Sequence, residues 1–318
     1  MADIKPFLTI EEQIQRLKDR GLIISDEKKA TCFLKSVNYY RFSGYTLTFR
    51  TKDIFHNRVS FEHVCQVYKL DSALRGLLLY MLDHVEIAFR TRIAYHHAQK
   101  YNPLGYLDVA NFDNPNYHQE FIDKFTEDIE NGKKLDELFV RHHIEKYEGK
   151  FPIWVAVELI SFGKLSKLYN NMRFEEKQAI AKEHYGVHCD YISNWLHGLS
   201  IIRNICAHRG RLYNRNVAIK LSLPKRFWSL GVSNNRVFAY IYVLKTLIKD
   251  DDLWNTFIIR LLDIINKYNG VDIQELGFPP NWLMVLVGLN NYEKTYNKLT
   301  DPASLSRKMR KTAGLSPE

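Results

Sequence analysis

Hydrophobic residues recur at helical spacing over most of the chain. The longest such pattern covers about residues 61–100, where leucine, isoleucine and methionine return every three or four positions. Near the amino terminus, Thr9 and Glu12 have the spacing of a capping box, and a helix is expected after them as far as Gly21. Ser25 is expected to cap a second helix that reaches about Val37.

Further helices are predicted where apolar positions keep this spacing after a starting signal. Pro152 suits the first turn of one helix, and Asp190 is placed to cap another. The predicted ranges are 117–131, 153–170, 190–210 and, as two or three helices, 235–299.

Two short stretches alternate apolar and polar residues with the period of a strand. They are Tyr45 to Arg50 and Val217 to Leu223. Because everything else is helical in pattern, the sequence predicts an all-α protein with at most a small two-stranded element.

Composition narrows the class of protein. With 46% hydrophobic and 25% charged residues, the chain has the balance of a globular protein. Its longest apolar stretch, near Trp282 to Leu289, is far shorter than the roughly 20 residues of a membrane span. The amino terminus lacks a secretory pattern, and the four cysteines form no CxxC pair. We therefore expect a cytoplasmic protein without a membrane segment, a disulfide framework or a zinc ribbon.

The net charge of the chain does not identify its binding partner. The chain carries 45 Lys and Arg against 36 Asp and Glu, a formal net charge of +9. This surplus is compatible with RNA, DNA or anionic lipid, and equally with solubility alone. The 12 histidines can transfer protons near neutral pH, and aromatic side chains can stack on bases or pack in a helical core.

The helix predicted at 190–210 has an apolar face and a narrow polar face. At about 100° per residue, the apolar side gathers Trp195, Leu199, Ile202 and Cys206. Arg203 lies on the flank and reaches the polar face only by its length. The polar face itself consists of His197, Ser200, Asn204, His208 and Arg211.

These side chains suit the cleavage of RNA without a metal ion. That reaction removes a proton from the 2′-hydroxyl, delivers one to the leaving 5′-oxygen and stabilises charge on the phosphate. A histidine can carry out the proton transfers, and the fork of an arginine can stabilise the phosphate. The alternative is that these residues are only the solvated face of an amphipathic helix.

Motifs elsewhere in the chain add to this helix. Arg203-Asn204-Ile205-Cys206-Ala207-His208 resembles the Arg-x4–6-His signature of HEPN ribonucleases. More specific segments precede it: KPFLT at 5–9, NYYRFSGY at 38–45, EIAFRTRIAY at 86–95, PIWVAVE at 152–158 and SFGKLSKLY at 161–169. Together with 203–216, and in this order, they resemble the Abi family, bacterial abortive-infection proteins of the AbiD/AbiF type. The resemblance covers about residues 5–223.

The resemblance implies a fold, a site and a biological setting. It implies a HEPN core that forms a homodimer, in which two Arg/His pairs meet and cut RNA, with Arg203, Asn204 and His208 as catalytic residues. It also implies phage defence or a toxin–antitoxin pair, in which a small non-coding RNA can restrain the nuclease. The expected modules are an amino-terminal helical part at 1–59, a HEPN-like core at 60–222, a helical extension at 223–300 and a basic tail at 301–318.

A second polar stripe lies on the helix predicted at 61–100. Glu86 and Arg90 form an i,i+4 pair, and Arg90 and Arg92 also precede His96 and His97 at the loose Arg-x4–6-His spacing. Glu86 and Arg90 are expected to support the active-site helix, or Arg90 and Arg92 to hold RNA phosphate. An ordinary solvated face is the alternative.

Other residues are candidates for binding RNA or supporting the site. Arg209, Arg211 and Arg215 follow the active-site helix and suit the positioning of phosphates. Tyr40 and Arg41 suit stacking on a base and pairing with phosphate, or packing under a turn. His197 is expected in a supporting role.

No cofactor or metal ion is expected. The His184-x3-His188 spacing can bind a metal on a helix, but no carboxylate or cysteine pair accompanies it. No Gly-rich phosphate loop is present, which argues against a nucleotide-dependent enzyme. The adjacent pairs His96-His97 and His142-His143 give no stronger indication of a metal.

The leading hypothesis is a metal-independent endoribonuclease that acts as a homodimer. Its alternatives are a non-catalytic RNA-binding module on the same fold and a regulator that contacts only proteins. The set Arg203, Asn204 and His208 favours the enzyme, because a binding module needs no titratable histidine at this position.

Overall fold

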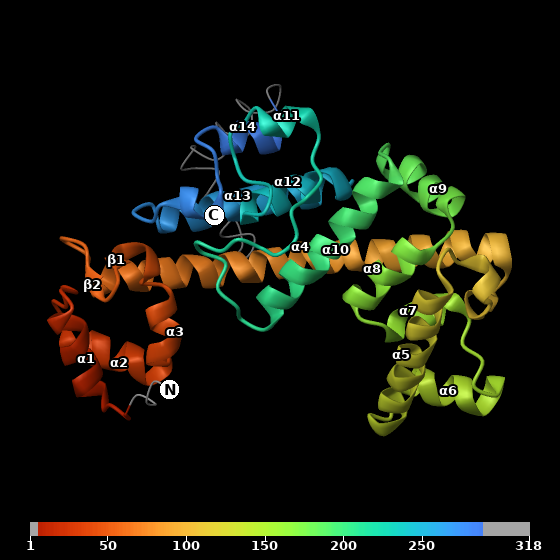
Figure 1. The fold of residues 1–318 in the computed structure, drawn as a ribbon, viewed down its shortest axis with the longest axis horizontal. Coiled ribbons are helices and arrows are strands. Elements are labelled where there is room, and N and C mark those ends of the chain that lie inside the picture. The colour runs from red at the N-terminus through yellow and green to blue at the C-terminus, as the bar shows by residue number, and fades with distance from the viewer. Residues whose placement is uncertain (1–5, 289–318) are drawn as a thin grey trace, which may run out of the picture. The chain divides into compact units, whose positions relative to one another are not determined.

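The computed structural model describes residues 6–288, and the chain over this range is mainly helical (Figure 1). This confirms the all-α prediction. The described residues divide into two compact units, the first made of 6–77, 205–215 and 255–288, the second of 78–204 and 216–254. The helices that contribute residues to both are α4 (Phe61–Tyr101), α10 (Cys189–Ala207) and α13 (Asp251–Lys267). The basic tail predicted at 301–318 lies outside the described residues.

The amino-terminal helices of the first unit begin at side-chain caps. Thr9 and Glu12 form the predicted capping box, in which the Thr9 hydroxyl accepts from the Glu12 N–H at 3.2 Å and the Glu12 carboxylate accepts from the Thr9 N–H at 2.7 Å. The second helix is capped by Asp26, one residue after the expected Ser25. The helices of this unit, besides its parts of α4, α10 and α13, are α1 (Ile10–Asp19), α2 (Glu27–Ser36), α3 (Tyr39–Gly44) and α14 (Trp282–Val287).

The strand predicted from Tyr45 to Arg50 is wrong for most of its length. Asn38 caps the N–H of Tyr40 at 2.7 Å and starts α3, so Tyr45 follows a helix and Leu47–Phe49 form a 3-10 turn. The small sheet comes immediately afterwards. Its strands are β1 (Arg50–Thr51) and β2 (Ile54–Phe55), paired antiparallel.

Part of the second unit is a group of helices around α5. Helix α5 packs against α6, α7 and α8, as Figure 1 shows in yellow to green. The single helix predicted at 153–170 is two helices, because the chain is extended at Ile160 and Ser161 caps α8. Besides its parts of α4, α10 and α13, this unit contains α5 (Pro115–Lys134), α6 (Leu138–Tyr147), α7 (Ile153–Leu159), α8 (Phe162–Asn171), α9 (Phe174–Tyr185), α11 (Lys225–Trp228) and α12 (Val237–Leu247).

The second predicted strand, Val217 to Leu223, is irregular, with a bend at Ala218 and Ile219, and has no strand partner in the described part of the chain. Side chains of α10 bind some of its backbone groups instead. Asn194 contacts the Lys220 carbonyl at 3.2 Å and the Ser222 N–H at 2.7 Å, and the Trp195 indole donates to the Ser222 carbonyl at 2.7 Å. The Val217 N–H donates to the Asn235 carbonyl at 2.8 Å and the Leu221 N–H to the Asn234 carbonyl at 3.0 Å. These backbone groups are therefore satisfied without a strand ladder.

Over residues 6–288, no helix combines the length and the apolar character that crossing a membrane requires. The 41 residues of α4 exceed the length of a span but are regularly interrupted by charged side chains.

Candidate active site

Helix α10 has the two faces that its sequence predicts. Trp195, Leu199, Ile202 and Cys206 are buried, whereas His197 and Asn204 are exposed. Ser200 is a correction, because it is buried and its hydroxyl donates to the His197 carbonyl at 2.8 Å. The polar face is therefore narrower than predicted.

Arg203 lies at the edge of this face, beside a buried carboxylate. Its Nε is 3.7 Å from Oε2 of Glu86 on α4, and its side chain remains 38% exposed. Its terminal nitrogen is 3.5 Å from Oδ1 of Asn204, which is long for a hydrogen bond, so this contact is weak. The guanidinium is thus anchored on one edge and open to solvent on the other.

Arg90 holds the Glu86 carboxylate in place. Its guanidinium donates to Oε1 of Glu86 at 2.5 Å and to the carbonyls of Val157 and Ile160, the latter at 2.8 Å. Both Arg90 and Glu86 are buried. The donors of Arg90 are thus directed at protein groups, which favours the expected support of the active-site helix through Glu86 over phosphate binding, and both roles stay predictions.

Arg92 is also directed into the protein. Its guanidinium donates to the hydroxyl of Tyr185 and lies 4.8 Å from the centre of that ring. The contact combines a hydrogen bond with a cation–π interaction. Arg92 thus binds a protein group while it remains half-buried, and its RNA-binding role stays a prediction.

His208 follows the end of α10 rather than lying inside it. The predicted helix extends to about Gly210, but α10 ends at Ala207. Gly210 N–H donates to the Ile205 carbonyl at 2.7 Å and Arg209 N–H to the Cys206 carbonyl at 3.1 Å, with Arg209 at φ 56°. This is a Schellman ending, in which His208 is the cap residue and Arg209 takes the left-handed position. The His208 imidazole is exposed.

Residues of α3 and α4 hold the turn after His208. Arg41 donates to the Arg209 carbonyl at 2.6 Å. Asp71, fully buried on α4, accepts from the N–H groups of Leu212 at 2.9 Å and Tyr213 at 2.7 Å. Its other oxygen accepts from the Tyr45 hydroxyl at 2.7 Å and from Arg75. Four donors therefore surround one carboxylate, which fixes the backbone that follows the histidine.

Two opposing effects act on the ionisation of Asp71. Burial raises its pKa above the ordinary value, and the charge of Arg75 and the hydrogen bonds from Tyr45, Tyr213 and Leu212 only partly oppose that rise. Because every contact of Asp71 is a donor, the ionised carboxylate matches its surroundings and a protonated one would not.

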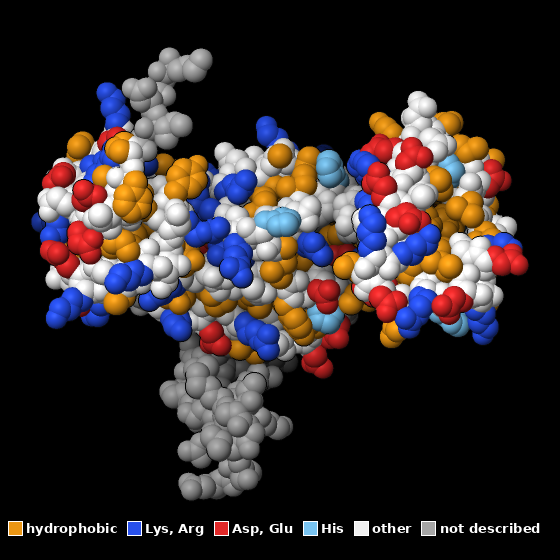
Figure 2. All heavy atoms as spheres, turned by 90° about the horizontal axis from the view of Figure 1, so that it is seen from below, with side chains coloured by type: hydrophobic (Ala, Val, Ile, Leu, Met, Phe, Trp, Pro, Cys, Tyr) orange, Lys and Arg blue, Asp and Glu red, His pale blue; other side chains and the backbone are white. Residues whose placement is uncertain are grey.

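The predicted RNA-binding residues differ in their solvent exposure and in their hydrogen bonds to the protein. Tyr40 is 86% exposed, and Arg209 and Arg215 are also exposed. Arg211 is half-buried and donates to the Tyr213 carbonyl at 2.7 Å, while Arg215 donates to the Arg211 carbonyl at 3.2 Å. On the face drawn in Figure 2, Lys and Arg side chains are spread among hydrophobic and acidic ones. The charge on this face therefore does not by itself indicate a path for RNA.

A groove of about 790 Å³ runs beside α10 in the second unit. Its walls come from α5, α8 and α10 and include His197, Lys164 and Lys167. Lys164 pairs with Asp128 at 2.7 Å, and Lys167 with Glu120 at 2.8 Å. Hydrogen bonds from Lys124 and Lys167 lower the pKa of Glu120 to about 2. The sequence reasoning missed these lysines, although two of them lie in the 161–169 motif.

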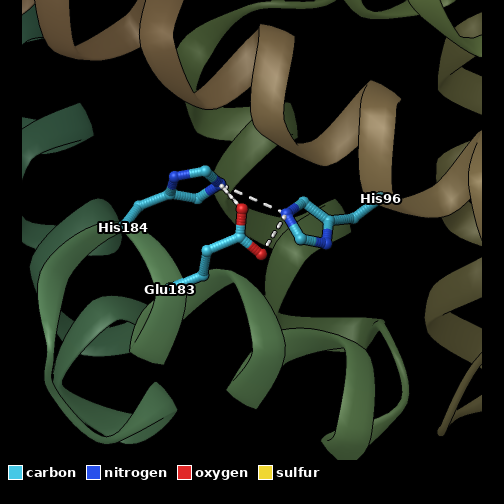
Figure 3. A group of neighbouring side chains, drawn as sticks. All are labelled: His96, Glu183 and His184. Atoms are coloured by element: carbon cyan, nitrogen blue, oxygen red, sulfur yellow. Dashed lines mark hydrogen bonds and ion pairs between the residues drawn. The ribbon is translucent and has the colours of Figure 1, made fainter.

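Two groups in the described residues could hold a metal ion. They are His96, Glu183 and His184, drawn in Figure 3, and His188, Cys189 and Asp190. The His184-x3-His188 spacing does not act as one helical pair, because α9 ends at Tyr185. His97 is separate from both groups, since it is buried against Glu176 at 2.9 Å.

Comparison with known proteins adds the family. Searches of curated proteins and of solved structures find no significant match to this chain. A family model described as Abi-like protein matches residues 32–214, more than half of the chain. This range includes α3, Glu86, α10 and the turn that holds His208. The chain therefore belongs to the Abi-like protein family.

Proposed function

We propose that the protein is an endoribonuclease of the HEPN type, with an AbiD/AbiF-like role in phage defence or in a toxin–antitoxin pair. Membership of the Abi-like family supports the biological setting. The observation that carries the activity is Arg203, whose guanidinium is anchored by buried Glu86 yet 38% exposed beside Asn204. His208 follows five residues later in the chain as an exposed imidazole.

The chemistry needs only groups that this chain carries. The 2′-oxygen of RNA loses its proton and forms a bond to the adjacent phosphorus, while the bond from phosphorus to the 5′-oxygen breaks. His208 transfers the proton, and Arg203 stabilises the charge that develops on the phosphate. The products are a 2′,3′-cyclic phosphate and a free 5′-hydroxyl. The reaction proceeds without a metal ion.

A homodimer completes the site. One Arg203/His208 pair can serve one side of the phosphate, whereas the cleavage has an acid step and a base step on opposite sides. A two-fold axis supplies a second pair from the same sequence. RNA is the substrate, and a small non-coding RNA is the inhibitor we propose for the resting protein.

The deciding experiment compares His208→Ala with the wild type in the presence of EDTA. We expect single-turnover cleavage to fall about 10²–10⁴-fold, whereas RNA binding stays within a few-fold. Arg203→Lys should also fail, because an ammonium lacks the planar fork, and Asn204→Ala should be milder. Cleavage by His208→Ala at the wild-type rate would overturn the assignment.

A non-catalytic RNA-binding module is the second candidate. The observation that favours it is the exposed set of Tyr40, Arg209 and Arg215, which can bind RNA whether or not His208 reacts. A growth assay in cells distinguishes the two candidate functions. A nuclease should stop growth on expression and lose that effect with His208→Ala, whereas a binding module should keep its effect in this variant.

A further inference from the structure

Helices α4 and α9 bring three metal-binding side chains together in the second unit. His96 comes from the carboxy-terminal part of α4, and Glu183 and His184 come from the last turn of α9 (Figure 3). The two imidazoles meet at their Nε2 atoms, 3.2 Å apart. The Glu183 carboxylate lies across them, with Oε2 3.7 Å from His96 and Oε1 3.8 Å from His184.

These distances are close to those expected for the ligands of one metal ion. Two imidazole nitrogens at about 2.0–2.1 Å from a tetrahedral Zn²⁺ lie about 3.3 Å apart, close to the observed spacing of the Nε2 atoms. The ligand atoms of the three side chains lie within 4.8 Å of one another, so the carboxylate has to move inward to bind the same ion. Without an ion, only one of the two Nε2 atoms can donate a hydrogen to the other, and the carboxylate faces both rings.

The three side chains are partly accessible to solvent. The side chains of His96 and His184 are 10% and 24% exposed, and that of Glu183 is 60% exposed. His96 also borders a surface hollow of about 320 Å³ with Lys100, Glu175 and Glu176. An ion can therefore enter from the Glu183 side and keep water as a fourth ligand.

We propose that His96, Glu183 and His184 bind one divalent transition-metal ion, with Zn²⁺ as the reference ion, and that the ion clips α9 to α4. Two imidazoles and one carboxylate suit Zn²⁺ and its neighbours, whereas Mg²⁺ and Ca²⁺ prefer all-oxygen ligands. The ion's role is structural. The proposal goes beyond the nuclease assignment and does not rest on it, because it uses neither Arg203 nor His208.

The second group of ligand residues is a weaker candidate. His188, Cys189 and Asp190 are consecutive in the chain, so they tie no two helices together. Burial raises the pKa of the Cys189 thiol, which opposes the thiolate that a metal requires. His188 is thus a matched control for nonspecific binding.

The test titrates the full chain with Zn²⁺ against a chromophoric chelator. We expect one ion per chain and a melting temperature raised by roughly 5 °C at a hundredfold excess over Kd. His96→Gln and His184→Gln should each weaken binding at least about a hundredfold, because outer-shell changes alone weaken it 10- to 100-fold. His188→Ala should bind like the wild type. Glu183→Gln, at an exposed position that tolerates change, should fold normally and still weaken binding.

Co²⁺ gives an independent readout, since its four-coordinate complexes absorb strongly in the visible range. The wild type and His188→Ala should show this absorption, and the three ligand variants should lose it. The proposal is overturned if the wild type binds no Zn²⁺ at micromolar free ion. It is also overturned if the His96 and His184 variants keep the affinity, or if His188→Ala alone removes it. None of these outcomes depends on whether the protein cleaves RNA.

Discussion

Glu86 Oε2 lies 3.7 Å from Nε of Arg203, and the opposite oxygen of the same carboxylate accepts from Arg90 at 2.5 Å. One buried acid therefore connects an arginine that is enclosed by protein to an arginine that reaches solvent. Arg90 donates to the carbonyls of Val157 in α7 and of Ile160 after it, which fixes the Glu86 carboxylate, and the carboxylate in turn orients Arg203. This makes Glu86 a positioning residue in the proposed site.

Glu86→Gln should impair cleavage more than RNA binding. The amide keeps the shape of the side chain but removes the charge that orients Arg203, so we expect a roughly 10- to 100-fold lower single-turnover rate. Arg90 also loses its buried counter-charge, which should lower the free energy of unfolding by about 1–3 kcal/mol.

Glu158→Gln is the matched control for that change. Its carboxylate is also near Arg90, at 3.9 Å, but its side chain is 58% exposed. We expect stability within about 0.5 kcal/mol of the wild type and unchanged cleavage. Equal single-turnover cleavage rates for Glu86→Gln and Glu158→Gln, measured under conditions in which both variants are folded, would contradict the positioning role of Glu86.

Arg209→Gly should stabilise the fold while weakening RNA binding. Arg209 occupies the left-handed position of the α10 ending, where glycine avoids a steric cost of about 1 kcal/mol. Urea unfolding and a filter-binding assay measure the two effects. Arg209→Ala keeps the backbone strain and removes the same charge, so it should weaken RNA binding equally without the gain in stability. A stabilised Arg209→Ala would show that the backbone argument is wrong.

Arg215→Ala should reduce the salt dependence of RNA binding. Each lost phosphate contact lowers the slope of log K against log salt by about one. Arg211→Ala should instead lower stability by about 1 kcal/mol, because its guanidinium donates to the Tyr213 carbonyl. Lys28→Ala, an exposed cation on α2, serves as the control for general charge. An Arg215 variant with the wild-type slope would remove this residue from the RNA-binding set.

The proposed homodimer predicts a measurable mass. Light scattering on the active protein should give twice the mass of the 318-residue chain, since two Arg203/His208 pairs are needed for one cleavage event. The wild type should lose specific activity on dilution below the dimer dissociation constant. A monomer that cleaves RNA with full specific activity at nanomolar concentration would contradict the shared site.

Thiol labelling tests the packing of α10. Cys206 is buried on its apolar face, and burial raises its pKa to about 12, whereas Cys32 is exposed. Iodoacetamide at pH 8 should therefore modify Cys32 quickly and Cys206 only after unfolding in urea, as mass spectrometry can follow. Comparable rates for the two thiols in native buffer would show that this face is not packed as described.

Local signals predicted the beginnings and the faces of the helices well. The capping box at Thr9 and Glu12 and the long helix at 61–101 follow from contacts within a few residues, which a sequence displays directly. The strand expected from Tyr45 failed because alternation over six residues cannot show that Asn38 starts a helix just before it. The break at Ile160 was missed for a similar reason, since one extended residue between two helices leaves the apolar period almost intact.

The sequence by itself determined that α10 has a buried side with Trp195 and Ile202 and an open side with Asn204, because helical periodicity sorts residues by face. Only the tertiary structure decided which charges are free. Arg90 and Arg203 are the same residue type, yet the carbonyls of Val157 and Ile160 bind the guanidinium of Arg90, whereas solvent reaches that of Arg203. Likewise, His96 meets Glu183 and His184 across 87 and 88 residues of chain. Periodicity fixes the direction in which a side chain leaves its own helix, whereas the partner it meets depends on how distant helices pack.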